Sequence, residues 1–190
     1  MYWGIDQALS YGSDTTLLAG SAGIVDTGTT LLMIATDAFD KYQRATGAKM
    51  DQATGLLTVT DSQFESMQSL FFNIGTTAFR DLTHCTLTIS SLPGGVTYEM
   101  TPNAQIWPRS LNSMLGGDEG KIYLVIADLG NNSGQGLDFI SEFLRSHWDK
   151  RVLMFLLDGF VFLQRFYSVY DTGNKSVGLA TTPFTDAETN

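Results

Sequence analysis

The sequence predicts an all-β fold with short helices, on the basis of its composition and its short alternating segments. Charged residues make up only 16% of the 190 residues, whereas there are 19 glycines and hydrophobic residues reach 43%. Such a composition is typical of globular β proteins with many turns. A chain of this length suits one domain with a sizeable core, so residues 1–190 are treated as a single unit.

In the first half of the chain, short runs of apolar residues predict strands. These runs are Tyr2 to Tyr11, Leu17-Leu18 with Ala22 to Val25, Leu31 to Ala35, Leu56 to Thr60, and Leu70 to Ile74. Thr36 is predicted to cap a helix over Asp37 to Thr46, which Gly47 ends. Ser62-x-x-Glu65 has the pattern of a capping box and predicts a short helix through Gln68.

The second half continues the β pattern. The predicted strands are Val96 to Met100, Ile122 to Ile126, Val161 to Phe166, Tyr167 to Tyr170, and Ser176 to Ala180. Asp171-Thr172-Gly173-Asn174 is predicted to form the turn between the last two strands, and Asp171 is expected to cap that turn.

Charge and cysteine content exclude several function classes. The net charge of −9 argues against nucleic acids and anionic membranes as partners, and it suits a protein that works in acid. The sequence shows no apolar run long enough to span a membrane and no signal-peptide pattern at its start.

The histidines and the cysteine do not form a recognisable metal or catalytic motif. His84 and Cys85 are adjacent but have no further metal-ligating residues near them in the sequence, and His147 has no Asp or Ser at the spacing of a catalytic motif. We therefore expect no metal and no cofactor.

The stretch from Ile24 to Leu32 carries the most specific chemistry. An apolar strand runs into Asp26, which is followed by Thr27-Gly28-Thr29-Thr30 and then by further apolar residues. The chain also contains Tyr2-Trp3-Gly4-Ile5-Asp6, Asn103 to Arg109, Gly136 to Ile140, Phe166 to Asp171, and Val177 to Ala180. Together these segments resemble the C-terminal lobe of a pepsin-like (A1) aspartic protease of the fungal polyporopepsin type.

The resemblance implies the fold, activity and site of that family. The fold would be one lobe of the bilobal acid protease, and the activity aspartic endopeptidase acting on peptides or proteins. Asp26 matches the second catalytic aspartate, and Thr27 the residue that ties the two active-site loops together. Gly28 matches the tight loop beside the water, and Thr29 a substrate-backbone contact, with Thr30 completing the loop. If residues 141–157 are left out, Gly159 follows the apolar Ile140, and the two match the apolar-apolar-glycine element that lies across this loop.

Aspartic protease chemistry requires two carboxylates that share one proton. The first lobe of the family, with its own Asp-Thr-Gly loop and a flap tyrosine, is expected to be missing. We therefore expect the chain to be inactive alone and to need an N-terminal lobe as partner; pairing of two copies is disfavoured. The alternative is a non-catalytic β domain that binds an extended peptide, or a truncated gene product. By resemblance the protein would be extracellular or vacuolar.

Two segments interrupt the resemblance. Residues 76–94 separate Gly75 from Gly95, and residues 141–157 separate Ile140 from Asp158. We interpret both as insertions and hypothesise that they are retained introns. Transcript reads that cross both segments unspliced would contradict the intron hypothesis.

Overall fold

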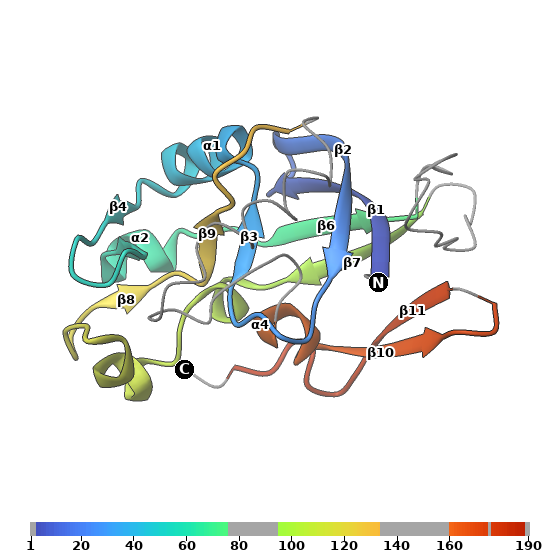
Figure 1. Ribbon diagram of the computed structural model, residues 1–190. Helices are drawn as coiled ribbons and strands as arrows, with labels where there is room; N and C mark the ends of the chain where they lie inside the picture. Colours follow the sequence, from blue (N-terminus) through green and yellow to red (C-terminus); the bar gives the residue numbers. More distant parts are fainter. Residues whose placement is uncertain (1–2, 76–94, 134–159, 175, 189–190) are drawn as a thin grey trace.

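The computed structural model describes residues 3–75, 95–133, 160–174 and 176–188 (Figure 1). Its largest element is an antiparallel sheet of four strands in the order β2-β1-β6-β7. The strands are β1 (Trp3–Tyr11), β2 (Thr15–Val25), β6 (Leu70–Ile74) and β7 (Val96–Met100). The predicted strands in these four regions are therefore confirmed for the described residues.

Smaller sheets flank the main sheet. β3 (Leu32–Ile34) pairs in parallel with β9 (Ile126–Asp128), and β5 (Leu57–Val59) lies between β4 (Lys49–Met50) and β8 (Ile122–Tyr123). The run from Ile122 to Ile126, predicted as one strand, is divided because it changes partners. Tyr123 pairs with Thr58 of β5, whereas Ile126 pairs with Leu32 of β3.

The C-terminal strands form a hairpin of their own, as predicted. β10 (Phe166–Asp171) pairs antiparallel with β11 (Ser176–Thr181). In the turn, Asp171 Oδ1 accepts a hydrogen bond from the Asn174 backbone N–H at 2.9 Å. The Tyr98 hydroxyl donates to the Leu179 carbonyl at 2.9 Å, which ties this hairpin to β7.

The predicted strand over Val161 to Phe166 is wrong except at Phe166, because Phe160–Leu163 form helix α4 and residues 164–165 form a turn. A short apolar run does not distinguish a strand from a buried helix by periodicity. The Phe162 ring is fully buried, with ring centroids 4.8 Å from Phe72 and 4.7 Å from Phe166. Packing on both sides therefore decides the local structure.

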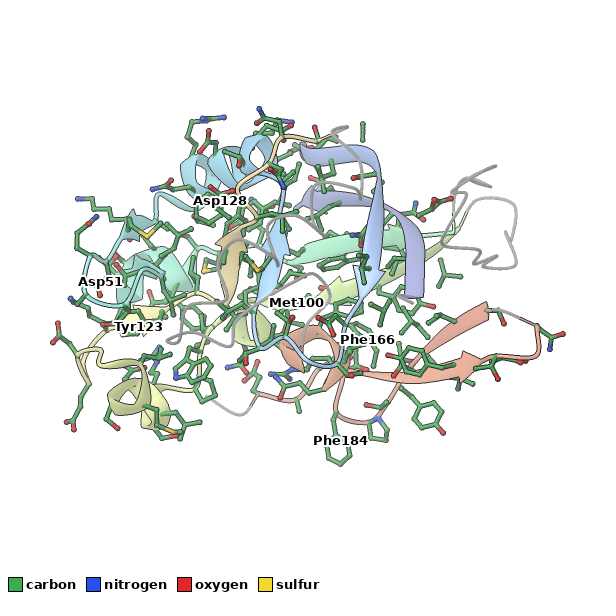
Figure 2. The ribbon with its side chains drawn as sticks, in the orientation of Figure 1. Asp51, Met100, Tyr123, Asp128, Phe166 and Phe184 are labelled. Carbon is green, nitrogen blue, oxygen red and sulfur yellow. The ribbon has the colours of Figure 1, made fainter. Side chains whose placement is uncertain are left out.

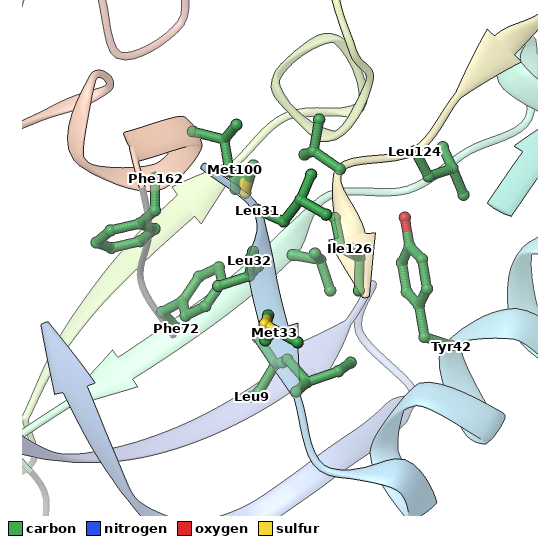
Figure 3. Close-up of a cluster of buried hydrophobic side chains, with 14 of the residues drawn as sticks. Leu9, Leu31, Leu32, Met33, Tyr42, Phe72, Met100, Leu124, Ile126 and Phe162 are labelled. Atoms are coloured by element: carbon green, nitrogen blue, oxygen red, sulfur yellow. The ribbon is translucent and has the colours of Figure 1, made fainter. Parts of the chain in front are cut away.

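The core surrounds β3. Figure 3 shows β3 passing through a cluster of buried side chains that also includes Leu9, Phe72, Met100, Ile126, Tyr42 and Phe162. These residues come from β1, β6, β7, β9, the helices α1 (Thr36–Thr46) and α4. The strand that leaves the Asp26 loop is thus held from all sides by apolar contacts.

Helix α1 begins one residue earlier than predicted. Thr36 is its first residue rather than its cap, and its hydroxyl donates to Asp128 Oδ1 at 2.7 Å. Figure 2 shows Asp128 close to α1. The helix ends at Gly47, whose φ of 68° lies in the left-handed region, as predicted.

Asp37, in the first turn of α1, makes the stability of the fold sensitive to acid. Its carboxylate accepts hydrogen bonds from the Ser133 hydroxyl and backbone N–H, at 2.6 and 2.8 Å. The Ser133 hydroxyl holds the pKa of Asp37 below its ordinary 3.8. Because the pKa of Asp37 is lower in the folded than in the unfolded state, the ionised carboxylate stabilises the fold at pH values above its unfolded-state pKa. This stabilisation is lost as the pH falls through the folded-state pKa.

In urea unfolding, Asp37→Asn and Ser133→Ala are each expected to be less stable than the parent at pH 6. The difference should shrink below about pH 4; a constant difference would contradict this account.

Helix α2 (Asp61–Glu65) corrects the predicted capping box. The cap is Thr60, not Ser62: the Gln63 backbone N–H donates to Thr60 Oγ1, and the Gln63 side chain accepts from the Thr60 N–H at 2.8 Å. Thr60 with Gln63 and Ser62 with Glu65 both have the spacing of a capping box, but Thr60 is the residue that directly follows β5. The short 3₁₀ helices Pro102–Gln105 and Arg109–Leu115 and strand β4 were not predicted.

Thr60→Ala is expected to lower the free energy of unfolding by about 1 kcal/mol, because it removes the capping oxygen. Ser62→Ala, at the predicted but unused cap, is expected to cost less. Urea unfolding of both variants measures the difference. Equal losses would contradict the assignment of Thr60 as the cap.

Within the described residues, no helix combines the length and apolarity needed to cross a membrane.

Candidate active site

The loop from Asp26 to Leu31 joins β2 to β3 (Figure 1). β2 is paired with β1 as far as Val25, which lies opposite Trp3. On the other side of the loop, the Leu32 backbone N–H donates to the Val125 carbonyl at 3.0 Å. Paired and buried strands on both sides therefore fix the position of the acid.

Both oxygens of the Asp26 carboxylate accept hydrogen bonds within the loop. The Gly28 backbone N–H donates to Oδ1 at 2.9 Å, and the Thr29 hydroxyl donates to Oδ2 at 2.8 Å. Among the described residues, no cation forms an ion pair with Asp26. The side chain is half-buried. Neutral donors thus orient a carboxylate that solvent still reaches, as an acid–base group requires.

The other loop residues divide into exposed and buried ones. Thr27 and Gly28 are exposed, and the Thr27 hydroxyl has no partner among the residues that the structure describes. A Cβ placed on Gly28 would lie 3.3 Å from Asp26 Oδ1, so a side chain there would crowd the carboxylate. Thr29 is only 1% exposed, and its hydroxyl donates its proton to Asp26.

Helix α4 supports the loop through a contact that sequence reasoning missed. The Val161 backbone N–H donates to the Thr30 carbonyl at 3.2 Å. Ile140 and Gly159, the residues expected to provide this support, lie outside the described residues. A backbone hydrogen bond does not depend on the type of side chain, and the sequence predicts a strand at Val161. The contact between Val161 and Thr30 could therefore not be predicted from the sequence.

The tripeptide Asp-Thr-Gly occurs a second time, at Asp171-Thr172-Gly173, and there it has another role. This copy forms the β10–β11 turn, where Asp171 accepts from Asn174 backbone and side chain. The backbone hydrogen bond from Asn174 is the main reason that the pKa of Asp171 is lowered. Asp26 differs from Asp171 in the strand that follows its loop: β3 is fully buried in the core, whereas β11 is largely exposed.

Thr29→Val is expected to lower the free energy of unfolding by about 1–2 kcal/mol, because it removes a donor to a charged oxygen without changing the volume of the side chain. Thr29→Ser keeps the hydroxyl and should recover most of this loss. Urea unfolding near neutral pH compares the two. If valine and serine cost the same, the hydrogen bond contributes nothing.

The chain is similar to known aspartic proteases in both sequence and structure. A family model described as eukaryotic aspartyl protease matches residues 1–94. Polyporopepsin of Irpex lacteus is 50% identical over 189 residues, which are 100% of this chain and 45% of the relative. Gastricsin of Suncus murinus is 30% identical, over 95% of this chain and 36% of the relative.

The structural similarity to a solved aspartic proteinase also covers almost the whole chain. The crystal structure of aspartic proteinase from Irpex lacteus superposes with a TM-score of 0.77 at 47% identity, covering 99% of this chain and 45% of that one. The chain thus spans less than half the length of these relatives. The sequence and fold matches, together with a carboxylate held at the end of β2, show that the chain belongs to the pepsin-like (A1) aspartic protease family.

Proposed function

We propose that this chain is the C-terminal lobe of an aspartic endopeptidase and supplies Asp26 as one of two catalytic carboxylates. The observation that carries the proposal is the half-buried Asp26, held by the Gly28 N–H and the Thr29 hydroxyl. The first lobe, with the other aspartate, belongs either to one longer polypeptide or to a separate chain.

The proposed mechanism divides one proton between the two carboxylates. Two such groups in close contact do not both ionise, so one stays protonated. The ionised carboxylate takes a proton from a water that attacks the peptide carbonyl, and the protonated one polarises that carbonyl and later helps to protonate the leaving amine. Gly28 and Thr29 keep Asp26 oriented. Without the second carboxylate, the chain is proposed to have little or no peptidase activity.

An apolar face of the β10–β11 hairpin supports the need for a partner lobe. Tyr167 and Val169 are 64% and 48% exposed, and they lie opposite Ala180 and Gly178, which are exposed as well. We call these four residues the hairpin face. Large aromatic and branched side chains on one sheet face are typical of a surface that another protein covers. The exposed Thr27 hydroxyl is available to the same partner.

The test is to mix the chain with a separately produced first lobe of an aspartic protease of the Irpex lacteus type. We expect a 1:1 complex by analytical ultracentrifugation and cleavage of a peptide at acid pH. The double variant Tyr167→Asp, Val169→Lys should weaken the complex about tenfold or more, which corresponds to about 1.4 kcal/mol. Met114→Lys, at a residue 75% exposed on Arg109–Leu115, is the matched control and should have no effect.

Other outcomes would contradict the proposal. Self-association of the chain through the hairpin face would indicate a homodimer instead. Binding of the first lobe without any cleavage would favour the non-catalytic peptide-binding domain.

A further inference from the structure

We propose that residues 76–94 are an insertion into a β-hairpin that is complete without them, and that the fold needs only a direct Gly75–Gly95 bond at this place.

The pairing of β6 and β7 continues without interruption to the ends of both strands. Leu70 lies opposite Met100, and the register advances one residue at a time until Ile74 lies opposite Val96. The strands therefore remain one strand spacing apart where residues 76–94 enter and leave. The Gly75 backbone N–H donates to the Asp6 carbonyl at 3.0 Å, so Gly75 is also held on the β1 side.

The two residues just beyond the last pair have the backbone of a tight turn. Gly75 has a φ of 85° and Gly95 a φ of 67°, both in the left-handed region. A two-residue hairpin loop of type I′ needs a positive φ at both central positions, and Gly-Gly is one of its preferred sequences. With residues 76–94 removed, Gly75 and Gly95 would be these two central residues. A long connection needs neither strict pairing up to its ends nor left-handed glycines at both of them.

Removing the segment should stabilise the hairpin. The connection between Ile74 and Val96 now contains 21 residues, 75–95, and would contain two after the deletion. The entropic cost of closing a loop grows as (3/2)RT ln n, where n is the number of loop residues, so a two-residue loop in place of one with 21 residues favours the folded state by roughly 30-fold. The left-handed glycines add no strain, because the parent structure already holds them in that conformation.

The experiment compares two deletions that differ by one residue. Deletion of 76–94 leaves the Gly75-Gly95 pair, whereas deletion of 76–95 leaves Gly75 alone between Ile74 and Val96. One residue cannot close the hairpin in register, and a one-residue slip would turn the buried Tyr98 and Met100 to the opposite face. Both variants carry the remainder of the 190-residue chain unchanged.

We expect the 76–94 deletion to fold with the circular dichroism of the parent and to show a folding equilibrium constant roughly 30-fold higher in urea unfolding. The 76–95 deletion should be less stable than the 76–94 deletion and should lose hydrogen-exchange protection in β6 and β7. Reduced stability of the 76–94 deletion relative to the parent would overturn the proposal. Equal stability of the two deletions would also overturn it, because the register of the turn would then have no consequence.

Discussion

Replacing Asp26 with Asn in the assembled two-lobe protein is expected to lower kcat/KM for a peptide substrate by roughly 10²- to 10⁴-fold, the usual contribution of a positioned acid–base group. Asparagine keeps the size of the side chain and still accepts a hydrogen bond from Gly28 or Thr29, so the loop should retain its shape. It cannot, however, take or give the proton. The loss should therefore fall on kcat rather than on the binding of substrate.

Asp171→Asn is the matched control, because it changes the aspartate of the other Asp-Thr-Gly triplet. Asp171 lies in the β10–β11 turn and should affect stability but not kcat/KM. A comparable loss of kcat/KM in both variants would show that Asp26 has no special role. Full activity of Asp26→Asn would exclude Asp26 as a catalytic group.

Phe162→Ala is expected to have the largest effect on stability, about 3–5 kcal/mol in the free energy of unfolding. The ring is 0% exposed and fills the space between Phe72 and Phe166. Its removal leaves a cavity between α4, β6 and β10, which the paired strands cannot collapse to fill. Because α4 also holds the Thr30 carbonyl through Val161, the Asp26 loop should lose order at the same time.

The control for Phe162 is Phe184→Ala. Phe184 is 69% exposed, and Figure 2 shows its ring projecting away from the fold. Its truncation should change the unfolding free energy by no more than about 0.5 kcal/mol. Urea unfolding of both variants measures the difference. A loss below about 1 kcal/mol for Phe162→Ala would contradict the role of this ring in the core.

Strands with a clear alternation could be predicted from the sequence. In β6 and β7, buried residues such as Phe72 and Met100 alternate with more exposed ones, and period two is a local property of a strand. The helix α1 was likewise marked by its own residues, above all Gly47. Elements whose conformation depends on distant partners were predicted less well. Phe162 of α4 packs on Phe72 of β6, and the run through Tyr123 divides because Tyr123 pairs with β5 whereas Ile126 pairs with β3.

In the candidate site, too, the features set by neighbouring residues could be predicted, whereas those set by distant residues could not. Asp26 could be found because the segment Asp26 to Thr30 lies between two apolar runs and has the sequence of the family's active-site loop, and Thr29 is close to it in sequence. The role of the Thr29 hydroxyl, buried on Asp26 Oδ2, depends on the fold of the loop and not on residue type. The contact from Val161 to Thr30 joins residues 131 positions apart, a distance that no local pattern covers.

The chain is proposed to supply one catalytic carboxylate, Asp26, and to need a first lobe for the other. The most direct test is to incubate the purified 190-residue chain with denatured haemoglobin at acid pH, with and without pepstatin, and then to add the first lobe. We predict no pepstatin-sensitive cleavage by the chain alone and clear cleavage once the first lobe is present. Pepstatin-sensitive cleavage by the chain alone that Asp26→Asn abolishes would contradict the need for a first lobe, because copies of this chain would then supply the whole catalytic site.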